Sequence, residues 1–403
     1  NPNANILYQE DWKEYLVGSG LYSSTFFNAS NNSENTSLYY SVGYENNETF
    51  MVNSRWEKIT ARFKGDSKIG ERIKVGGNLA YSITNQNAPD GFDGGTAYSN
   101  PFQWTRHIAP IYPVHAYDDN GEKIYLPNGN VAYDDGTGTY TGRVRRYGEL
   151  QNPYATALYD KKLSKAHQVF ASGYAGVNIV EGLDFKYIVT GEHRGTRGYD
   201  MDTPLYGDAV GVNGRLYNYS RNVNSINQQQ LLEYNKHFDA LELDVLVGHE
   251  TYSRDNDYMQ HHVTNGLIPN SIYSDMYATL RDATGYATPY SLESYLGRVN
   301  LNYDGRYYLT GSFRGDGSSR FHTDNRWGNF FSVGGSWIVS NEDFFQSNLI
   351  NQLKLKASYG EVGNDNLGYA FPYLDLFSVV QTPEDVDNIS YNQIFKGNKD
   401  ITW

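Results

Sequence analysis

The stretch IKVGGNLAYSIT, residues 73–84, alternates apolar and polar side chains through most of its length. A period of two residues is typical of a β-strand, in which successive side chains point to opposite faces. The predicted strand therefore has one apolar face and one polar face. The apolar face carries Ile73, Val75, Leu79, Tyr81 and Ile83, and the polar face carries Lys74, Asn78, Ser82 and Thr84.

The same alternation returns along the chain, for example in LDFKYIVTG (183–191), LELDVLVGHE (241–250) and LKLKASYG (353–360). The repeats predict an all-β protein with about twelve strands. These strands are expected at 21–30, 36–45, 57–65, 73–85, 166–180, 183–196, 228–238, 241–253, 293–303, 306–315, 329–339 and 353–361.

The links between the predicted strands alternate strictly between short and long. Glu181-Gly182 and Asp304-Gly305 are predicted tight hairpin turns, where glycine accepts a positive φ. Short turns at one rim and long loops at the other are typical of an outer-membrane β-barrel, whose strands need about ten residues to cross the bilayer. A soluble β-sandwich also predicts alternation, but it does not predict this asymmetry. The short links are 31–35, 66–72, 181–182, 239–240, 304–305 and 340–352, and the long ones are 46–56, 86–165, 197–227, 254–292, 316–328 and the chain after 362.

Composition agrees with this architecture. The 403 residues include 37 Tyr and 40 Gly, which suit strands and tight turns, and no apolar run reaches the length of a transmembrane helix. The chain has no Cys, which excludes disulfides and thiolate chemistry. A net charge of −13 argues against a nucleic-acid partner. The first residues, NPNANILYQEDW, lack a signal-peptide core, so we expect a mature, truncated or excised chain.

No motif predicts catalysis, a metal or a cofactor. The acidic clusters around Asp118-Asp119 and Asp134-Asp135 lack the full spacing of a calcium loop, so solvated turn tips are the favoured interpretation. His261-His262 has no zinc-binding helical context, and Arg314-Gly315-Asp316 lacks the lysine of a phosphate loop. No Ser/His/Asp arrangement stands out. The site hypotheses therefore concern binding alone.

The longest predicted loop, 86–165, is rich in aromatic residues. Trp104, Tyr112 and Tyr117 are weak candidates for substrate binding, because flat rings stack on sugars or contact a partner protein. Packing of the loop against itself explains these residues equally well.

The segment 293–365 closely resembles the SusC/RagA family of TonB-linked outer-membrane transporters from Bacteroidetes. The resemblance rests on the run from Tyr307 through Arg320-Phe321, Arg326-Trp327-Gly328 and Trp337 to EDFF (342–345), followed by SYGEVGND (358–365). EDWKEYL (10–16) and APIYPV (109–114) agree in order and spacing. Gly315 and Phe331 depart from residues that are common in the family.

The resemblance implies that residues 1–403 are an internal portion of a 22-stranded barrel, with the N-terminal plug domain absent. Within it, 1–20 is expected to be a connector, and 86–165, 197–227 and 254–292 to be long extracellular loops. A portion of a barrel leaves two unpaired sheet edges, so the first and last strands are not expected to pair with each other.

The resemblance also implies gated import without bond chemistry, and hence no enzyme and no catalytic residues. The expected location is the outer membrane of a Gram-negative, Bacteroidetes-type cell. The expected partners are a SusD-like surface lipoprotein that acts as a lid, TonB through the absent plug region, outer-membrane lipid, and an oligosaccharide or peptide cargo. No cofactor is implied. The polar strand faces, for example Glu242, Asp244, Lys354 and Lys356, are expected to line the plug or the wet interior.

Two other functional classes remain open at this stage. One is a soluble β-rich protein that binds or cleaves glycans, and the other is a passive porin or surface adhesin. The Arg-Gly-Asp tripeptide invites the adhesin interpretation. In the barrel interpretation Leu309, Gly311 and Phe313 face lipid, Arg314 faces inward, and Asp316-Gly317 lies in a turn.

Overall fold

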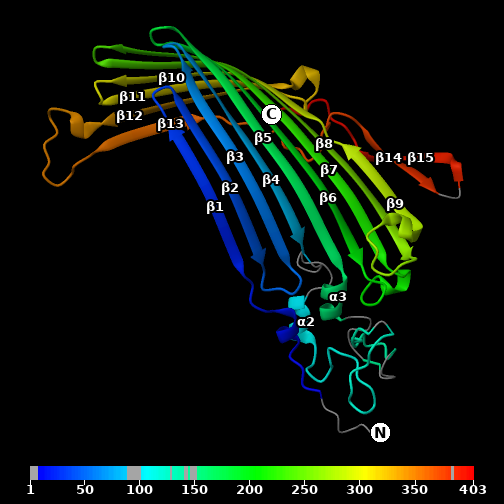
Figure 1. The fold of residues 1–403 in the computed structure, drawn as a ribbon. Coiled ribbons are helices and arrows are strands. Elements are labelled where there is room, and N and C mark those ends of the chain that lie inside the picture. The colour runs from blue at the N-terminus through cyan, green and yellow to red at the C-terminus, as the bar shows by residue number, and fades with distance from the viewer. Residues whose placement is uncertain (1–7, 89–100, 128, 140–143, 146–151, 383–384) are drawn as a thin grey trace.

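The computed structural model describes residues 8–88, 101–127, 129–139, 144–145, 152–382 and 385–403. Within these residues thirteen strands form one antiparallel sheet, and a separate pair, β14 (Leu376–Thr382) and β15 (Asp385–Phe395), forms a second. Figure 1 shows the large sheet as a strongly curved wall of strands lying side by side. No helix in the described part of the chain is long and apolar enough to cross a membrane.

The strands of the large sheet differ greatly in length, from seven to 26 residues. Their bounds are β1 (Tyr22–Asn32), β2 (Thr36–Glu48), β3 (Arg55–Ile69), β4 (Ile73–Asn87), β5 (Lys161–Val180), β6 (Leu183–Asp202), β7 (Arg215–Phe238), β8 (Leu241–Gly266), β9 (Tyr277–Ala287), β10 (Tyr290–Tyr303), β11 (Tyr307–Ser318), β12 (Trp327–Ile338) and β13 (Lys354–Gly360).

Each strand pairs with its neighbour in the chain, with one exception. β8 pairs with β9 along its last third and with β10 along the rest, so β9 lies off the main order. Among the described residues β1 pairs only with β2 and β13 only with β12, which leaves two open edges. The first and last strands of the sheet do not pair, as the sequence predicted.

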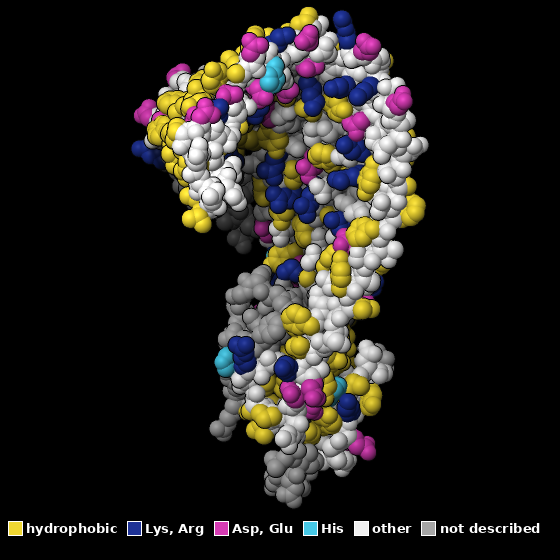
Figure 2. All heavy atoms as spheres, turned by 90° about the vertical axis from the view of Figure 1, so that its left-hand side faces the viewer, with side chains coloured by type: hydrophobic (Ala, Val, Ile, Leu, Met, Phe, Trp, Pro, Cys, Tyr) yellow, Lys and Arg dark blue, Asp and Glu magenta, His cyan; other side chains and the backbone are white. Residues whose placement is uncertain are grey.

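The two faces of the sheet differ as the alternation predicted. Apolar side chains on the convex face are uncovered; Val247 is 56% exposed, Leu309 49% and Phe331 50%. The opposite face carries the polar residues, and Figure 2 shows Lys and Arg side chains gathered in its hollow. The face of Leu309 is called the outer face below, and the face of Arg314 the inner face. An uncovered apolar face is typical of the lipid-facing side of a membrane β-barrel.

All twelve predicted strands are present, but several run further than predicted. β6 and β7 continue through most of 197–227, so the connection shrinks to 203–214, and 254–292 holds the end of β8 and all of β9. The chain after 362, predicted as a loop, contains β14 and β15. In these extensions the backbones stay paired, but neither face of the sheet needs to be apolar. The alternation of apolar and polar residues is therefore absent there, and the sequence does not predict the strands.

The predicted hairpin turns have the expected backbone. Gly182 has φ +82°, and Asp304-Gly305 has φ +55° and +63°. These positive values suit the tight turns that join β5 to β6 and β10 to β11. The tight turns thus lie at one rim, but the link between β12 and β13 on that rim, predicted to be short, spans 339–353; the longest connection, between β4 and β5, lies at the opposite rim.

The longest connection folds into a small unit with its own core. The unit comprises residues 8–17, 101–139 and 144–160 where described, and we call it the loop module. Its helices lie beyond the rim where β4 ends and β5 begins (Figure 1). They are α1 (Trp12–Leu16), α2 (Pro101–His107) and α3 (Pro153–Tyr159). The predicted connector, 1–20, therefore contributes a helix to this unit.

Candidate functional site

The inner face carries a charged network centred on Arg314 of β11. Its guanidinium donates to Glu250 at 3.0 Å, to Ser294 at 2.9 Å and to Asp316 at 2.7 Å. Asp316 is only 8% exposed. The Arg-Gly-Asp tripeptide therefore forms an internal ion pair within one strand. Its two charged side chains contact each other and the inner wall, which leaves no free adhesion motif.

The polar set predicted to line the interior does lie on the inner face, near the rim of short turns. Arg298 and Asn300 contact Asp244 at 3.5 and 2.8 Å, and Asn302 donates to Glu242 at 2.7 Å. The Lys354 ammonium lies 5.1 Å from the centre of the Tyr308 ring, and Lys356 shares its face. Glu242, Asp244, Asn300 and Asn302 pair between the neighbouring strands β8 and β10 and line a cavity of about 770 Å³. The arrangement favours a role in stabilising the sheet and in contacting the plug expected inside the barrel.

A second polar cluster closes the opposite rim around Asp365, the last residue of SYGEVGND. Its Oδ2 accepts from the Tyr290 hydroxyl at 2.8 Å and from the Ser318 hydroxyl at 2.7 Å. Arg320 donates to the backbone carbonyl of Asp365 at 2.9 Å and lies over the Tyr290 ring at 4.7 Å. One carboxylate thus joins the start of β10, the end of β11 and the segment after β13.

Replacing Asp365 by Ala is expected to loosen this rim without unfolding the sheet. The change leaves two hydroxyl donors without their acceptor and removes the 3.5 Å ion pair with Arg320, which keeps the backbone carbonyl, at a cost of about 1–3 kcal/mol. Hydrogen exchange in 319–326 and 361–366 should accelerate, while exchange in the paired centre of β11 stays unchanged. Asp365→Asn keeps one acceptor oxygen and should give an intermediate rate; unchanged exchange in both variants would contradict this role.

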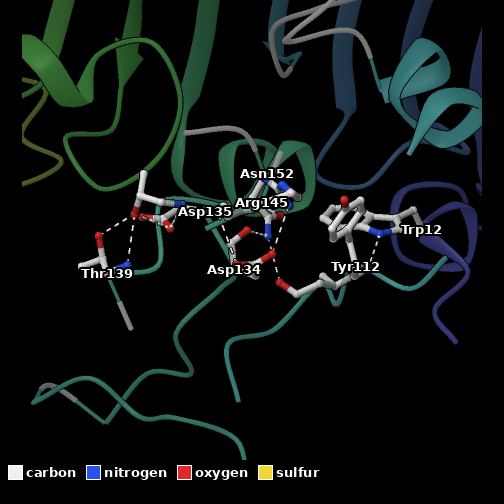
Figure 3. Close-up of polar contacts among 11 residues, drawn as sticks. Trp12, Tyr112, Asp134, Asp135, Thr139, Arg145 and Asn152 are labelled. Atoms are coloured by element: carbon white, nitrogen blue, oxygen red, sulfur yellow. Dashed lines mark hydrogen bonds and ion pairs between the residues drawn. The ribbon is translucent and has the colours of Figure 1, made fainter. Parts of the chain in front are cut away.

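The loop module is organised around a buried ion pair (Figure 3). Arg145 donates to Asp134 at 3.1 Å, and their side chains are 2% and 10% exposed. The guanidinium also lies 5.3 Å from the Trp104 ring centre and 5.9 Å from that of Tyr112. Gly136 has φ +78°, and a Cβ there would lie 2.7 Å from the guanidinium. A glycine is required for this close approach.

Hydrogen bonds hold the rest of the loop module together. The Asn152 side chain, fully buried, donates to the carbonyls of Val114 and Asp134 at 2.8 and 2.9 Å, and it caps α3 by accepting from Ala155 at 3.0 Å. Trp12 of α1 donates to the Tyr112 carbonyl at 3.0 Å. Burial raises the pKa of Asp134, although Arg145 opposes this shift.

The three aromatic candidates differ in accessibility. Trp104 is 2% exposed and packs against Trp12 in the core of the loop module, so its ring is not available to a ligand in this conformation. Tyr112 is half-buried beside Arg145. Tyr117 stacks on Tyr8 at 4.9 Å, and burial raises its pKa. Tyr112 and Tyr117 stay as proposals for binding, whereas the placement of Trp104 favours packing.

The other motifs have structural explanations. Asp118 accepts from the backbone amides of Asn120 and Glu122, each at 2.9 Å, and so closes a turn tip. His261 contacts Ser274 at 2.5 Å on the outer face, while His262 stacks on Tyr217 at 4.1 Å on the inner face. The described residues contain no group of three or more His, Cys, Asp or Glu that could hold a metal ion.

Comparison with known proteins gives relatives of one kind. The chain is 28% identical over 371 residues to TonB-dependent receptor P3 of Formosa agariphila, covering 89% of this chain and 34% of that protein. It is 27% identical over 426 residues to TonB-dependent receptor SusC of Bacteroides thetaiotaomicron, covering 98% of this chain and 40% of that protein. The chain thus spans about a third to two fifths of their length. No protein-family model matches it.

Structure comparison gives the same answer. The RagAB peptide importer in its open-open state superposes with a TM-score of 0.79 and 25% identity, over 99% of this chain and 42% of that one. The closed-closed state gives a TM-score of 0.79 at 24% identity, over 99% of this chain and 42% of that one. These results confirm the predicted antiparallel barrel architecture and the resemblance to SusC/RagA proteins.

Proposed function

We propose that this chain, a relative of the SusC/RagA receptors, forms part of the barrel of a TonB-dependent outer-membrane importer. The observation that carries the proposal is the two-faced sheet, with an uncovered apolar outer face and a charged inner face around a hollow. Lipid on one side and an aqueous path on the other require this division. The names of the relatives support energy coupling through TonB.

The proposed cargo is an oligosaccharide or a peptide, which is too large for diffusion through a simple pore. The RagAB structures are of a peptide importer, and this supports a peptide cargo without excluding a glycan. A SusD-like lipoprotein is the proposed partner at the rim of the loop module. Tyr112 and Tyr117 lie in that module and stay the proposed aromatic contacts of the partner or cargo.

Deleting the complete protein is expected to abolish growth of the host on the cargo, supplied as defined oligosaccharides or as peptides. Disrupting TonB should have the same effect, because the proposed path opens only when energy is supplied. The measurement is uptake of labelled cargo in parent, deletion and TonB-deficient cells. Uptake that persists without TonB would favour a passive porin, and recovery of the protein in the soluble fraction would favour a soluble glycan-binding protein.

A further inference from the structure

Two cations lie directly opposite each other on the outer face. Lys165 of β5 and Arg197 of β6 are register partners, and both side chains are exposed. In the part of the chain that the structure describes, neither is within ion-pair distance of a carboxylate. Like charges at directly opposed positions destabilise a pair of strands. A bound anion would relieve the repulsion.

A groove of about 880 Å³ surrounds this pair. Its lining includes Leu163, Tyr199 and Met259 beside the two cations, and the Arg55–Glu57 ion pair at its far side. One border is formed by the segment before β9, where Ser274 bonds to Asn218 at 2.7 Å and to His261 at 2.5 Å. With three cations and one carboxylate, the groove has a net charge of about +2 within a partly apolar lining, which suits an anionic group attached to an apolar body.

The groove lies at the level where the outer face changes from apolar to polar. The outer-face residues of β5, taken toward the rim of the loop module, are the apolar Val169, then His167 and then Lys165. His167 bonds to the Tyr81 hydroxyl at 2.8 Å, and His193 of β6 bonds to Asn224 at 2.6 Å. Tyrosine and histidine with polar tips are typical of the membrane interface. Lys165 and Arg197 would thus meet lipid headgroups.

The nearest carboxylate in the same row of the sheet is already engaged. Glu57 is in register with Asn85, which is in register with Lys165, so two strand spacings, or about 10 Å, separate the two backbones. The Glu57 carboxylate contacts Arg55 at 2.5 Å. Glu57 is therefore already paired, and an external anion could neutralise the two facing cations.

We propose that the groove around Lys165 and Arg197 binds the phosphate of a lipid in the outer leaflet, with the acyl chains lying over the apolar surface toward the opposite rim. Arginine and lysine donate strong, charge-assisted hydrogen bonds to phosphate oxygens. The inference rests on the membrane placement given under Proposed function, but it does not depend on what is transported.

The test measures lipid retention by the complete protein in detergent, using native mass spectrometry. The probes are phosphorylated lipid A and the same lipid A after removal of its phosphate. The double variant Lys165→Gln/Arg197→Gln removes both cations and is expected to bind phosphorylated lipid A at least about tenfold more weakly, because the loss of even one charge-assisted hydrogen bond has that effect. The wild type should discriminate between the two lipids by a similar factor.

Arg194→Gln is the matched control, because it removes one cation from the same strand on the inner face and should leave lipid binding unchanged. The swap Lys165→Arg/Arg197→Lys keeps both charges and should retain binding. Equal binding of the two lipids by the wild type would overturn the proposal. Retention of the lipid by the double variant would also overturn the proposal. So would a wild-type complex that contains a second copy of the chain in the groove, and no lipid, if the double variant fails to form it. Recovery in the outer membrane is scored separately, so failure of the proposed location remains distinguishable.

Discussion

Leu309→Arg is expected to reduce stable assembly in the membrane, whereas Thr310→Arg, one residue further, is expected to be tolerated. Leu309 is 49% exposed on the outer face and lies between Leu301 and Gly335 in the sheet register. An arginine on the lipid-facing side costs about 2–4 kcal/mol at the bilayer midplane and less toward the interface, and Leu309 lies two residues into β11 from the rim of short turns. On the inner face, the same side chain meets water and polar neighbours.

The measurement is the amount of folded protein in purified outer membranes, judged by resistance to unfolding in sodium dodecyl sulfate before heating. Both variants introduce the same residue into the same strand, so strand propensity and total charge are matched. Equal loss of folded protein in the two variants would contradict the assignment of faces. Loss in Thr310→Arg alone would reverse the assignment.

Arg145→Met is expected to unfold the loop module while leaving the large sheet intact. The change removes the ionic partner of Asp134 and leaves a carboxylate that is 10% exposed. Removing one member of a buried ion pair typically costs about 3–5 kcal/mol. Limited proteolysis should then cleave within 101–160, while the paired strands β5 to β8 remain protected.

The defect should be smaller in mild acid. Because burial raises the pKa of Asp134, this group favours folding below its ordinary pKa, and its contribution is lost as pH rises through the raised value. The variant has no guanidinium to oppose that shift, so protonation should relieve the buried charge. Proteolysis of Arg145→Met at pH 5 should therefore be slower than at pH 7.5 relative to wild type. The double variant Arg145→Met/Asp134→Leu should be protected at both values; cleavage of it would point to the lost ring contacts.

The strands that face lipid were predictable because the membrane requires an apolar side chain at every second position. The sequence from Ile73 to Thr84 satisfies that requirement, and β4 runs through it. The end of β8, from Arg254 to Gly266, does not satisfy it. There the chain reads RDNDYMQHHVTNG, and pairing with β7 and β9 supplies the order. Because backbone hydrogen bonds form with almost any side chain, such a segment carries no alternation of apolar and polar residues in its sequence.

From the sequence, the polar residues could be assigned to one face of the sheet, but their hydrogen-bond partners could not be predicted. Alternation predicted that Arg314 and Asp244 point inward, but Glu250 is the partner of Arg314 across 64 residues of sequence. That pairing depends on the register of three strands. In the loop module no period exists at all, and the aromatic content of 86–165 was compatible with binding or packing. The burial of Trp104 favours packing for that residue only.

The length of β7 and β8 has a consequence for partners. Twenty-four register pairs join these strands, and each strand extends about 80 Å at the usual rise per residue. This is more than twice what a bilayer crossing needs, so the sheet itself supplies much of the rim. A protein that docks at this rim contacts strands whose backbone is already ordered by the folding of the sheet. Little conformational entropy is lost on contact, and any opening motion must come from a hinge in the partner or in the shorter connections.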